Sequence, residues 1–305
     1  MILIADSGST KTDWALCAER GSNIKGEAAC VRIKTQGLNP FYQQNEEIIN
    51  VLQNELFPQI SNSISTIEEV YFYGAGCTET KISMMEATIS EALTRFTSEG
   101  KVRVVSVAGD LLAAARAACG REAGIACILG TGANSGLYDG KQIVKNIPPL
   151  GFILGDEGSG AVLGKLFLNA IFKEQLPTRV KEAFLTETHQ TYADIIDRVY
   201  RQPLPNRYLA SISKFIRQHL DEFALHSIVE QNFDAFFKNN IMRYDYSRNY
   251  PIAVVGSVGK IYEDILKKCA DKQGYKLTNV LAAPMEGLIK YHTLQTFSGN
   301  NFKKN

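Results

Sequence analysis

The sequence lacks a long apolar run, a block of like charge and any Cys-x-x-Cys pair. No stretch approaches the ~20 apolar residues that span a bilayer, and the apolar residues 2–5 stop at Asp6 without the basic region of a signal peptide. The formal net charge is only +1 at pH 7, whereas a nucleic-acid-binding protein would usually carry a basic face or stripe. We therefore expect a soluble cytoplasmic protein that binds neither nucleic acid nor membrane.

The cysteines are scattered along the chain, at Cys17, Cys30, Cys77, Cys119, Cys127 and Cys269. A disulfide framework or a zinc site requires regular, paired spacing, and most of these residues have apolar neighbours in the sequence. The pattern therefore predicts reduced thiols in the core of a cytosolic protein.

Hydrophobic residues make up 45% of the 305 residues, which is enough for two domains with real cores. Apolar runs that indicate buried strands alternate with amphipathic helical patterns, as is typical of an α/β protein. Residues 125–138 repeat the plan of residues 2–16: a strand, a turn of small residues and a second strand. Residues 159–239 are expected to be almost wholly helical. Two similar halves would leave a cleft between them, a common place for ligands.

Three turns of small residues, at 6–12, 130–135 and 256–259, each follow an expected buried strand. Glycines in such turns let backbone N–H groups approach an anion closely, and Ser and Thr hydroxyls add further donors. One turn alone would indicate little, because such turns end many strands. Three together favour one nucleotide site. The first is not a P-loop, because no glycine directly precedes Lys11.

These turns, together with the stretch Gly155-Asp156-Glu157-Gly158-Ser159, resemble motifs of a known family. The turns are similar to the phosphate-1, phosphate-2 and adenosine motifs of the actin, hexokinase and Hsp70 ATPases. The later stretch is similar to that of N-acetylglucosamine kinases and of the BadF/BadG/BcrA/BcrD ATPase family around them. The resemblance covers nearly the whole chain in motif order and spacing.

The resemblance implies an α/β fold of two ribonuclease H-like domains of the actin-like ATPase type with a central cleft. We expect an N-terminal domain at 1–112 and a larger domain with a helical insertion at 113–284. A C-terminal helix within 285–305 would pack back onto the first domain. The oligomeric state is not readable from the sequence, although homodimers are common in the family.

ATP and Mg²⁺ are the cofactors that the resemblance implies. Asp6 would orient the Mg²⁺ ion, in part through water, because Mg²⁺ keeps several of its waters. Lys11 would either add positive charge at the phosphates or point to solvent. The residues expected to bind the nucleotide are Ser7, Gly8, Ser9, Thr10, Lys11, Thr12, Gly130, Thr131, Gly132, Asn134, Gly256, Ser257 and Gly259.

Asp110 is the candidate catalytic base, since the family has an Asp at the matching place that contacts the attacking sugar hydroxyl. Asp110 also precedes the Ala-rich run 111–119 and so would suit the N-terminal cap of a helix. The phosphate-type turns favour the catalytic interpretation, and one residue can serve both purposes.

The resemblance places Asn39, Gly151 and Asp156 against the sugar. Asn39 precedes Pro40 and would equally form a turn, while Asp156 and Glu157 would also favour the dipole of the next helix. We favour a sugar contact for Asp156 and leave Glu157 open. Human-type relatives have Gly-Trp-Gly before this motif, where residues 149–151 read Pro-Leu-Gly, so the identity of the amino sugar stays open.

The function predicted from the resemblance is ATP-dependent transfer of phosphate to the 6-hydroxyl of an amino sugar, with N-acetylglucosamine the first candidate. The alternative is a BadF-type ATPase that activates a 2-hydroxyacyl-CoA dehydratase or benzoyl-CoA reductase and shares an iron–sulfur cluster between two subunits. That role needs paired cysteines at a dimer surface. Cys119 and Cys127 are the only close pair, and Cys127 lies in an expected buried strand. A sugar sensor without turnover is a third alternative, against which Asp6 and Asp110 argue.

Overall fold

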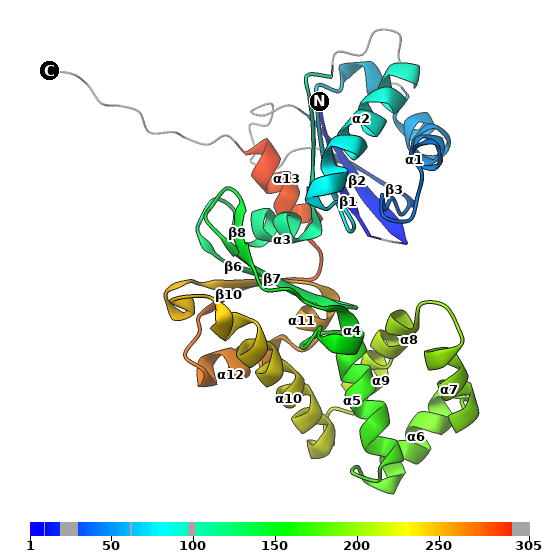
Figure 1. The fold of residues 1–305 in the computed structure, drawn as a ribbon, viewed down its shortest axis with the longest axis vertical. Helices are drawn as coiled ribbons and strands as arrows, with labels where there is room; N and C mark the ends of the chain where they lie inside the picture. The colour runs from blue at the N-terminus through cyan, green and yellow to red at the C-terminus, as the bar shows by residue number, and fades with distance from the viewer. Residues whose placement is uncertain (9, 19–29, 62, 97–101, 295–305) are drawn as a thin grey trace, which may run out of the picture. The chain divides into compact units, whose positions relative to one another are not determined.

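The computed structural model describes residues 1–8, 10–18, 30–61, 63–96 and 102–294 (Figure 1). The chain divides into two compact units: Met1–Ala117 with the segment that begins at Met285, and Ala118–Pro284. The boundary expected at residue 112 lies within helix α3 (Asp110–Ala118). Ser9 and the end of the expected C-terminal helix, residues 295–305, lie outside the described residues. Within those ranges, no helix combines the length and the apolar character needed to cross a membrane.

The first unit is built on a mixed sheet with the strand order β3-β2-β1-β4-β5. Strands β1, β2 and β3 form antiparallel pairs, while β4 and β5 run parallel to β1. The strands are β1 (Ile2–Ser7), β2 (Lys11–Cys17), β3 (Cys30–Gln36), β4 (Glu69–Gly74) and β5 (Val104–Gly109).

Side chains of β2 alternate between two cores, as the pleat of a strand requires. Trp14 packs in the first core with Ile48 and Ile89, whereas Ala15 packs in the second with Leu288. The first core lies under α1 (Asn45–Val51), the π-helical turn Leu52–Leu56, the 3₁₀ turns Phe57–Ile60 and Ile64–Thr66, and α2 (Glu79–Phe96). The second lies under α3 and α13 (Met285–Thr293).

The second unit has a sheet of the order β8-β7-β6-β9-β10, which is the order of the first sheet, position for position. Its strands are β6 (Gly124–Leu129), β7 (Ala133–Tyr138), β8 (Ile143–Asn146), β9 (Ile252–Val255) and β10 (Leu277–Leu281). The pair β6–β7 is antiparallel and β6–β9 is parallel, as in β1–β2 and β1–β4. The predicted repeat of one plan and the predicted α/β class are therefore confirmed.

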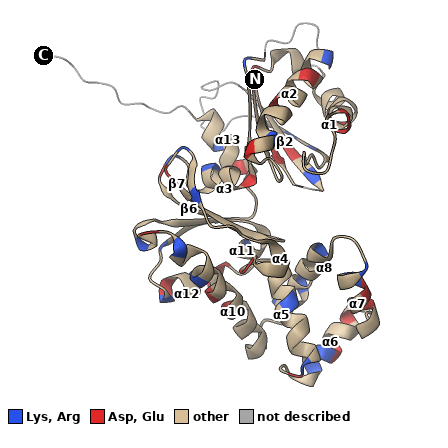
Figure 2. Ribbon diagram, viewed as in Figure 1, with Lys and Arg blue, Asp and Glu red and all other residues tan. Residues whose placement is uncertain are grey.

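Helices fill most of the chain between β8 and β9, as the sequence predicts, and they continue after β9. They are α4 (Gly151–Leu154), α5 (Gly160–Phe172), α6 (Thr178–Thr188), α7 (Tyr192–Tyr200), α8 (Pro205–Ser211), α9 (Ser213–Gln218), α10 (Phe223–Asn239), the 3₁₀ turns Ile241–Arg243 and Ser247–Asn249, α11 (Ser257–Ile261) and α12 (Glu263–Lys272). Acidic and basic residues are interspersed along these helices (Figure 2).

The prediction that all the cysteines are reduced thiols is wrong for Cys17 and Cys30, which form a disulfide with a Cα–Cα distance of 4.2 Å. The two residues stand directly opposite each other on β2 and β3, so the sheet brings together sulfurs that are 13 positions apart in the sequence. Spacing along the sequence could not predict this disulfide, because the register of β2 and β3 decides which cysteines meet. Cys77, Cys119, Cys127 and Cys269 are free.

Candidate functional site

The β1–β2 turn is held from inside by its own hydroxyl groups. The Oγ atoms of Ser7 and Thr12 are 2.7 Å apart, and both side chains are buried. Ser7 Oγ also donates to the carbonyl of Leu38 at 2.9 Å. Ser7 and Thr12 thus shape the turn from within, whereas Gly8 and Thr10 are exposed.

Lys11 lies at the exposed edge of the same turn. Its Nζ is 2.9 Å from Asp13 Oδ2, and its carbonyl accepts a hydrogen bond of 3.0 Å from the Gly8 amide. The ammonium group is therefore close to the turn but already paired with a carboxylate. A phosphate would compete with Asp13 for it.

Asp6, at the end of β1, lies in an excess of negative charge. Burial raises its pKa to about 6, and the carboxylates of Asp13 and Asp110 add to the rise. Lys11 and Arg32 offset part of it. A bound cation would stabilise the ionised form of the Asp6 carboxyl group in this environment.

The donor set around Asp6 fits Mg²⁺ in the way kinases use it. Mg²⁺ prefers oxygen ligands and is usually held by one or two carboxylates together with substrate phosphates and waters. In the parts of the chain that the structure describes, no group of three or more His, Cys, Asp or Glu could hold a metal by itself. An ion at Asp6 would thus be held jointly with the phosphates.

Asp110 is the first residue of α3 and follows β5 directly. Burial raises the pKa of its carboxyl group, and hydrogen bonds from the backbone amides of Leu111 and Asp110 itself oppose the rise. An N-terminal cap accepts from the amides two or three residues further on, so these contacts do not identify Asp110 as a cap of that kind. The raised pKa agrees with a proton acceptor.

Asn39 is almost fully buried and forms a turn of its own. Its Oδ1 accepts a hydrogen bond of 2.9 Å from the backbone amide of Phe41, and its own backbone amide donates to Gln43 Oε1 at 2.7 Å. A Cβ atom added to Gly76 would lie 2.1 Å from Asn39 Oδ1, so the loop after β4 passes directly against this side chain. Gly76 has φ +83°, which a glycine adopts without strain.

Cys77 connects Asn39 and Gly76 to Asp110. A Cβ atom added to Gly109 would be 3.5 Å from the Cys77 carbonyl oxygen. Burial raises the pKa of the Cys77 thiol to about 12, and the negative charge of Asp110 contributes to the rise. The first unit therefore gathers Asn39, Gly76 and Asp110 at the carboxyl ends of its parallel strands. Ligands of open α/β sheets bind at that edge.

In the second unit, Asp156 lies against the 130–135 turn. A Cβ at Gly132 would be 3.0 Å from Asp156 Oδ2, and the Ala133 amide donates a hydrogen bond to the same carboxylate. Burial is the main cause of the raised pKa of Asp156. A candidate phosphate turn and a candidate sugar residue are thus in contact.

The turn itself caps helix α5. The carbonyls of Gly130 and Thr131 accept hydrogen bonds from the amides of Gly160 and Ala161, at 2.8 and 3.1 Å. Asn134 Oδ1 accepts from Asn146 Nδ2 at 2.9 Å, which ties the turn to β8. Gly151 begins the short helix α4 and is exposed.

The loop before α5 is fixed by a residue that the sequence did not single out. Asn232 of α10 accepts from the Gly158 amide at 2.9 Å and donates to the Ser159 carbonyl at 3.1 Å. Glu157 accepts a hydrogen bond of 2.7 Å from Asn239. Glu157 therefore faces α10. Asn232 could not be identified from the sequence, because a single Asn on the apolar face of a helix forms no recognisable motif.

The third turn touches the second. Gly256 has φ +134°, and its added Cβ would lie 2.3 Å from the Leu129 carbonyl oxygen. Gly259 packs against the side chains of Val254 and Leu129, while Ser257 is exposed. The ends of β6 and β9 thus hold the two candidate nucleotide turns of this unit as one structure.

A scan of protein-family models and a search of curated proteins each returned no match. Among solved structures, the chain is similar to a Porphyromonas gingivalis protein provisionally named an N-acetylglucosamine kinase, with 48% sequence identity and a TM-score of 0.87. The alignment covers 96% of this chain and 99% of that one. A Chromobacterium violaceum protein with the same provisional name has 16% identity and a TM-score of 0.65, over 95% of this chain and 98% of that one, and supports the fold alone.

Proposed function

Since the chain belongs to the N-acetylglucosamine kinase family of the actin–hexokinase–Hsp70 ATPase superfamily, we propose that it is an ATP-dependent sugar kinase. Its acceptor is the 6-hydroxyl of an amino sugar, with N-acetylglucosamine the first candidate. The observation that best supports the proposal is the cluster of Asn39, Gly76 and Asp110 at one edge of the first sheet. ATP is available in the cytoplasm, and we place the reaction there.

In this proposal Asp110 accepts the proton of the sugar hydroxyl as that oxygen attacks the γ-phosphorus of ATP. ADP is the leaving group, and the phosphate ester forms on the sugar. Phosphoryl transfer needs little covalent help from a protein beyond positioning, charge neutralisation and a proton acceptor. Asn39, Gly151 and Asp156 position the sugar.

The nucleotide is held by the three turns. The exposed groups of Gly8, Thr10 and Lys11 face the phosphates, and Ser7 and Thr12 keep that turn in shape. The 130–135 turn and the 256–259 turn supply the second phosphate contact and the adenosine contact. Mg²⁺ at Asp6 would neutralise phosphate charge.

The activator alternative finds no support in Cys119 and Cys127. Cys127 is fully buried, and burial raises the pKa of Cys119 to about 11 and that of Cys127 well above its ordinary value. Cluster ligands must be thiolates that reach the subunit surface. The raised pKa values disfavour the thiolate form of both residues, and Cys127 does not reach the surface.

The test is ADP release from MgATP with N-acetylglucosamine, glucosamine, N-acetylmannosamine, N-acetylmuramic acid and glucose. We expect one amino sugar to raise the rate at least about 10-fold over the rate without sugar, as a hydroxyl acceptor aligned for attack requires. The 6-deoxy form of that sugar should give no product. A rate that is the same with and without every sugar would refute the kinase.

Gly76→Ala should raise the KM for the sugar by about 10-fold and lower kcat less, because the new methyl group displaces the Asn39 side chain. The matched control is Gly120→Ala, which also has a positive φ (+64°) but no atom within 4 Å of its Cβ. Steady-state kinetics of both variants measure the KM for the sugar and kcat. Equal KM values for the two would show that Asn39 does not hold the sugar.

A further inference from the structure

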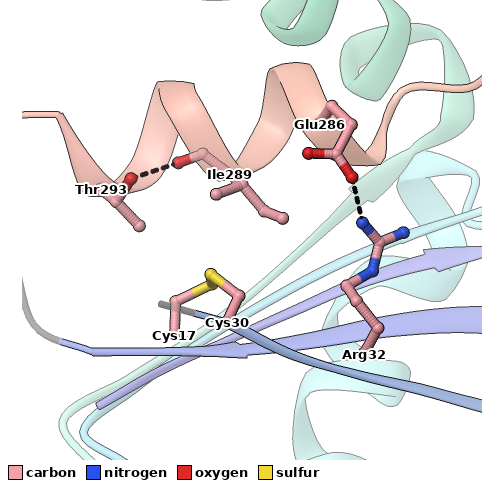
Figure 3. The surroundings of a disulfide bond; sticks show 6 residues. All are labelled: Cys17, Cys30, Arg32, Glu286, Ile289 and Thr293. Carbon is pink, nitrogen blue, oxygen red and sulfur yellow. Dashed lines mark hydrogen bonds and ion pairs between the residues drawn. A yellow bond between two sulfur atoms is a disulfide. The ribbon is translucent and has the colours of Figure 1, made fainter. Parts of the chain in front are cut away.

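A disulfide joins the end of β2 to the start of β3, and the proposed kinase reaction does not use it. Figure 3 shows the Cys17–Cys30 disulfide beneath α13, with Ile289 and Thr293 above it. We propose that Cys17 and Cys30 are a reversible redox modification site that fastens the edge strand β3 to the first unit. The inference rests on the structure and is independent of the proposed kinase function.

Strand β3 is weakly covered at this end. Among the described residues it forms the edge of its sheet and pairs on one side, with β2. Val31 is 56% exposed and Arg32 is also exposed, whereas the buried residues of the strand, Ile33 and Thr35, lie further along it. A covalent bond at Cys30 therefore adds a firm attachment where burial supplies little.

Both cysteines take part in the contacts with α13. Cys17 belongs to the apolar cluster that contains Leu288 and Ile289, and Cys30 packs against that cluster. Strand β3 also reaches α13 through the ion pair between Arg32 and Glu286, whose side chains are 42% and 79% exposed. Exposed ion pairs contribute little, so this pair holds β3 less firmly than the covalent bond to β2 does.

The two sulfurs differ in exposure to solvent, and this difference decides which one reacts first with an external thiol or disulfide. Cys17 is fully buried, whereas Cys30 is partly exposed. An external reagent therefore meets Cys30 first. The step needs an oxidant, for which a low-molecular-weight disulfide such as glutathione disulfide is the chemical class.

In the forward direction, the Cys30 thiolate attacks glutathione disulfide, forms a mixed disulfide and releases one glutathione. Cys17, which stands opposite Cys30 on the neighbouring strand, then loses its proton and attacks the Cys30 sulfur, and the second glutathione leaves. Two protein thiols lose two electrons and two protons, and one glutathione disulfide becomes two thiols. Reduction runs the same exchange backwards, with a glutathione thiolate attacking the Cys30 sulfur.

The other thiols do not compete for the oxidant. Burial raises the pKa of Cys77 and of Cys269 to about 12 and that of Cys119 to about 11, so little thiolate is present at neutral pH. The thiolate is the reactive form.

The experiment uses the full chain equilibrated in glutathione buffers of increasing oxidised fraction. After acid quenching, denaturation and alkylation, intact mass counts the free thiols. We expect six in reducing buffer and four in oxidising buffer, with Cys17 and Cys30 joined in the peptide map, and six again on return to reducing buffer. Six thiols under every buffer, or a bond that excess glutathione never opens, would overturn the proposal.

Thermal unfolding is the second readout. The oxidised protein should unfold about 5–10 °C above the reduced one, as expected for a cross-link that closes a short loop. Cys30→Ser should abolish the difference between the buffers, and the matched variant Cys119→Ser should keep it. Equal midpoints for the oxidised and reduced wild type would contradict the fastening role. The mass readout on wild type decides the redox site even where Cys30→Ser fails to fold.

Discussion

Asp110→Asn is expected to lower the sugar-dependent rate of ADP formation by about 10²- to 10⁴-fold, the usual contribution of a general base. The amide cannot accept the proton of the attacking hydroxyl at neutral pH, yet it has nearly the shape of the carboxylate. Sugar binding, measured by calorimetry, should change much less than kcat. The loss should therefore appear mainly in kcat.

The same substitution separates catalysis from a structural role at the start of α3. The side-chain oxygen of Asn can accept the same backbone hydrogen bonds as the Asp carboxylate, so α3 keeps its start. Burial raises the pKa of Asp110 above that of the unfolded chain, so ionised Asp110 lowers the stability of the folded protein as pH rises through that range. The neutral amide removes this cost, and the unfolding midpoint at pH 7 should be unchanged or higher.

The matched control is Asp139→Asn. Asp139 also accepts backbone hydrogen bonds, from Lys141 and Gln142 at 2.8 Å each, but it lies in an exposed turn of the second unit. Its activity should stay within about twofold of wild type, as is usual for surface changes away from special features. If Asp110→Asn retained activity within tenfold, the role of Asp110 would be structural and not that of the base.

The sequence predicted the hairpins β1–β2 and β6–β7 because their signals are local. An apolar strand followed by a turn of small residues is visible in a window of about ten residues. Strand β3 was missed, since Arg32 and Lys34 interrupt its apolar pattern with charge at the exposed edge. The Cys17–Cys30 pairing was missed with it, because register follows from the strand.

The candidate site also mixes local and non-local features. The turns were singled out by their small residues and by the family resemblance, whereas Asn232 and Gln43 form contacts that no short motif records. The inward orientation of Ser7 and Thr12 was also hidden, because a hydroxyl in a turn can donate to a ligand or to the protein. Only the packed structure decides between these partners.

Gly256→Ala should destabilise the second unit by about 3 kcal/mol or more and raise the KM for ATP at least about 10-fold. The backbone at Gly256 has φ +134° and ψ 153°, a region that is essentially restricted to glycine. The added methyl group would also meet the Leu129 carbonyl oxygen at 2.3 Å and its carbon at 2.6 Å. Those atoms belong to β6, a strand paired on both sides, so they cannot move away cheaply.

Gly130→Ala is the matched control, because it places the same methyl group on the partner turn. Its Cβ would have no atom within 4 Å, and its φ is not positive. We expect a change within about 0.5 kcal/mol in unfolding free energy, as for a substitution without strain or clash. Denaturant unfolding of both variants compares their stability, and ATP titration compares Gly256→Ala with wild type. Equal stability of the two variants, together with an unchanged KM for ATP in Gly256→Ala, would mean that contact between the turns does not organise the nucleotide site.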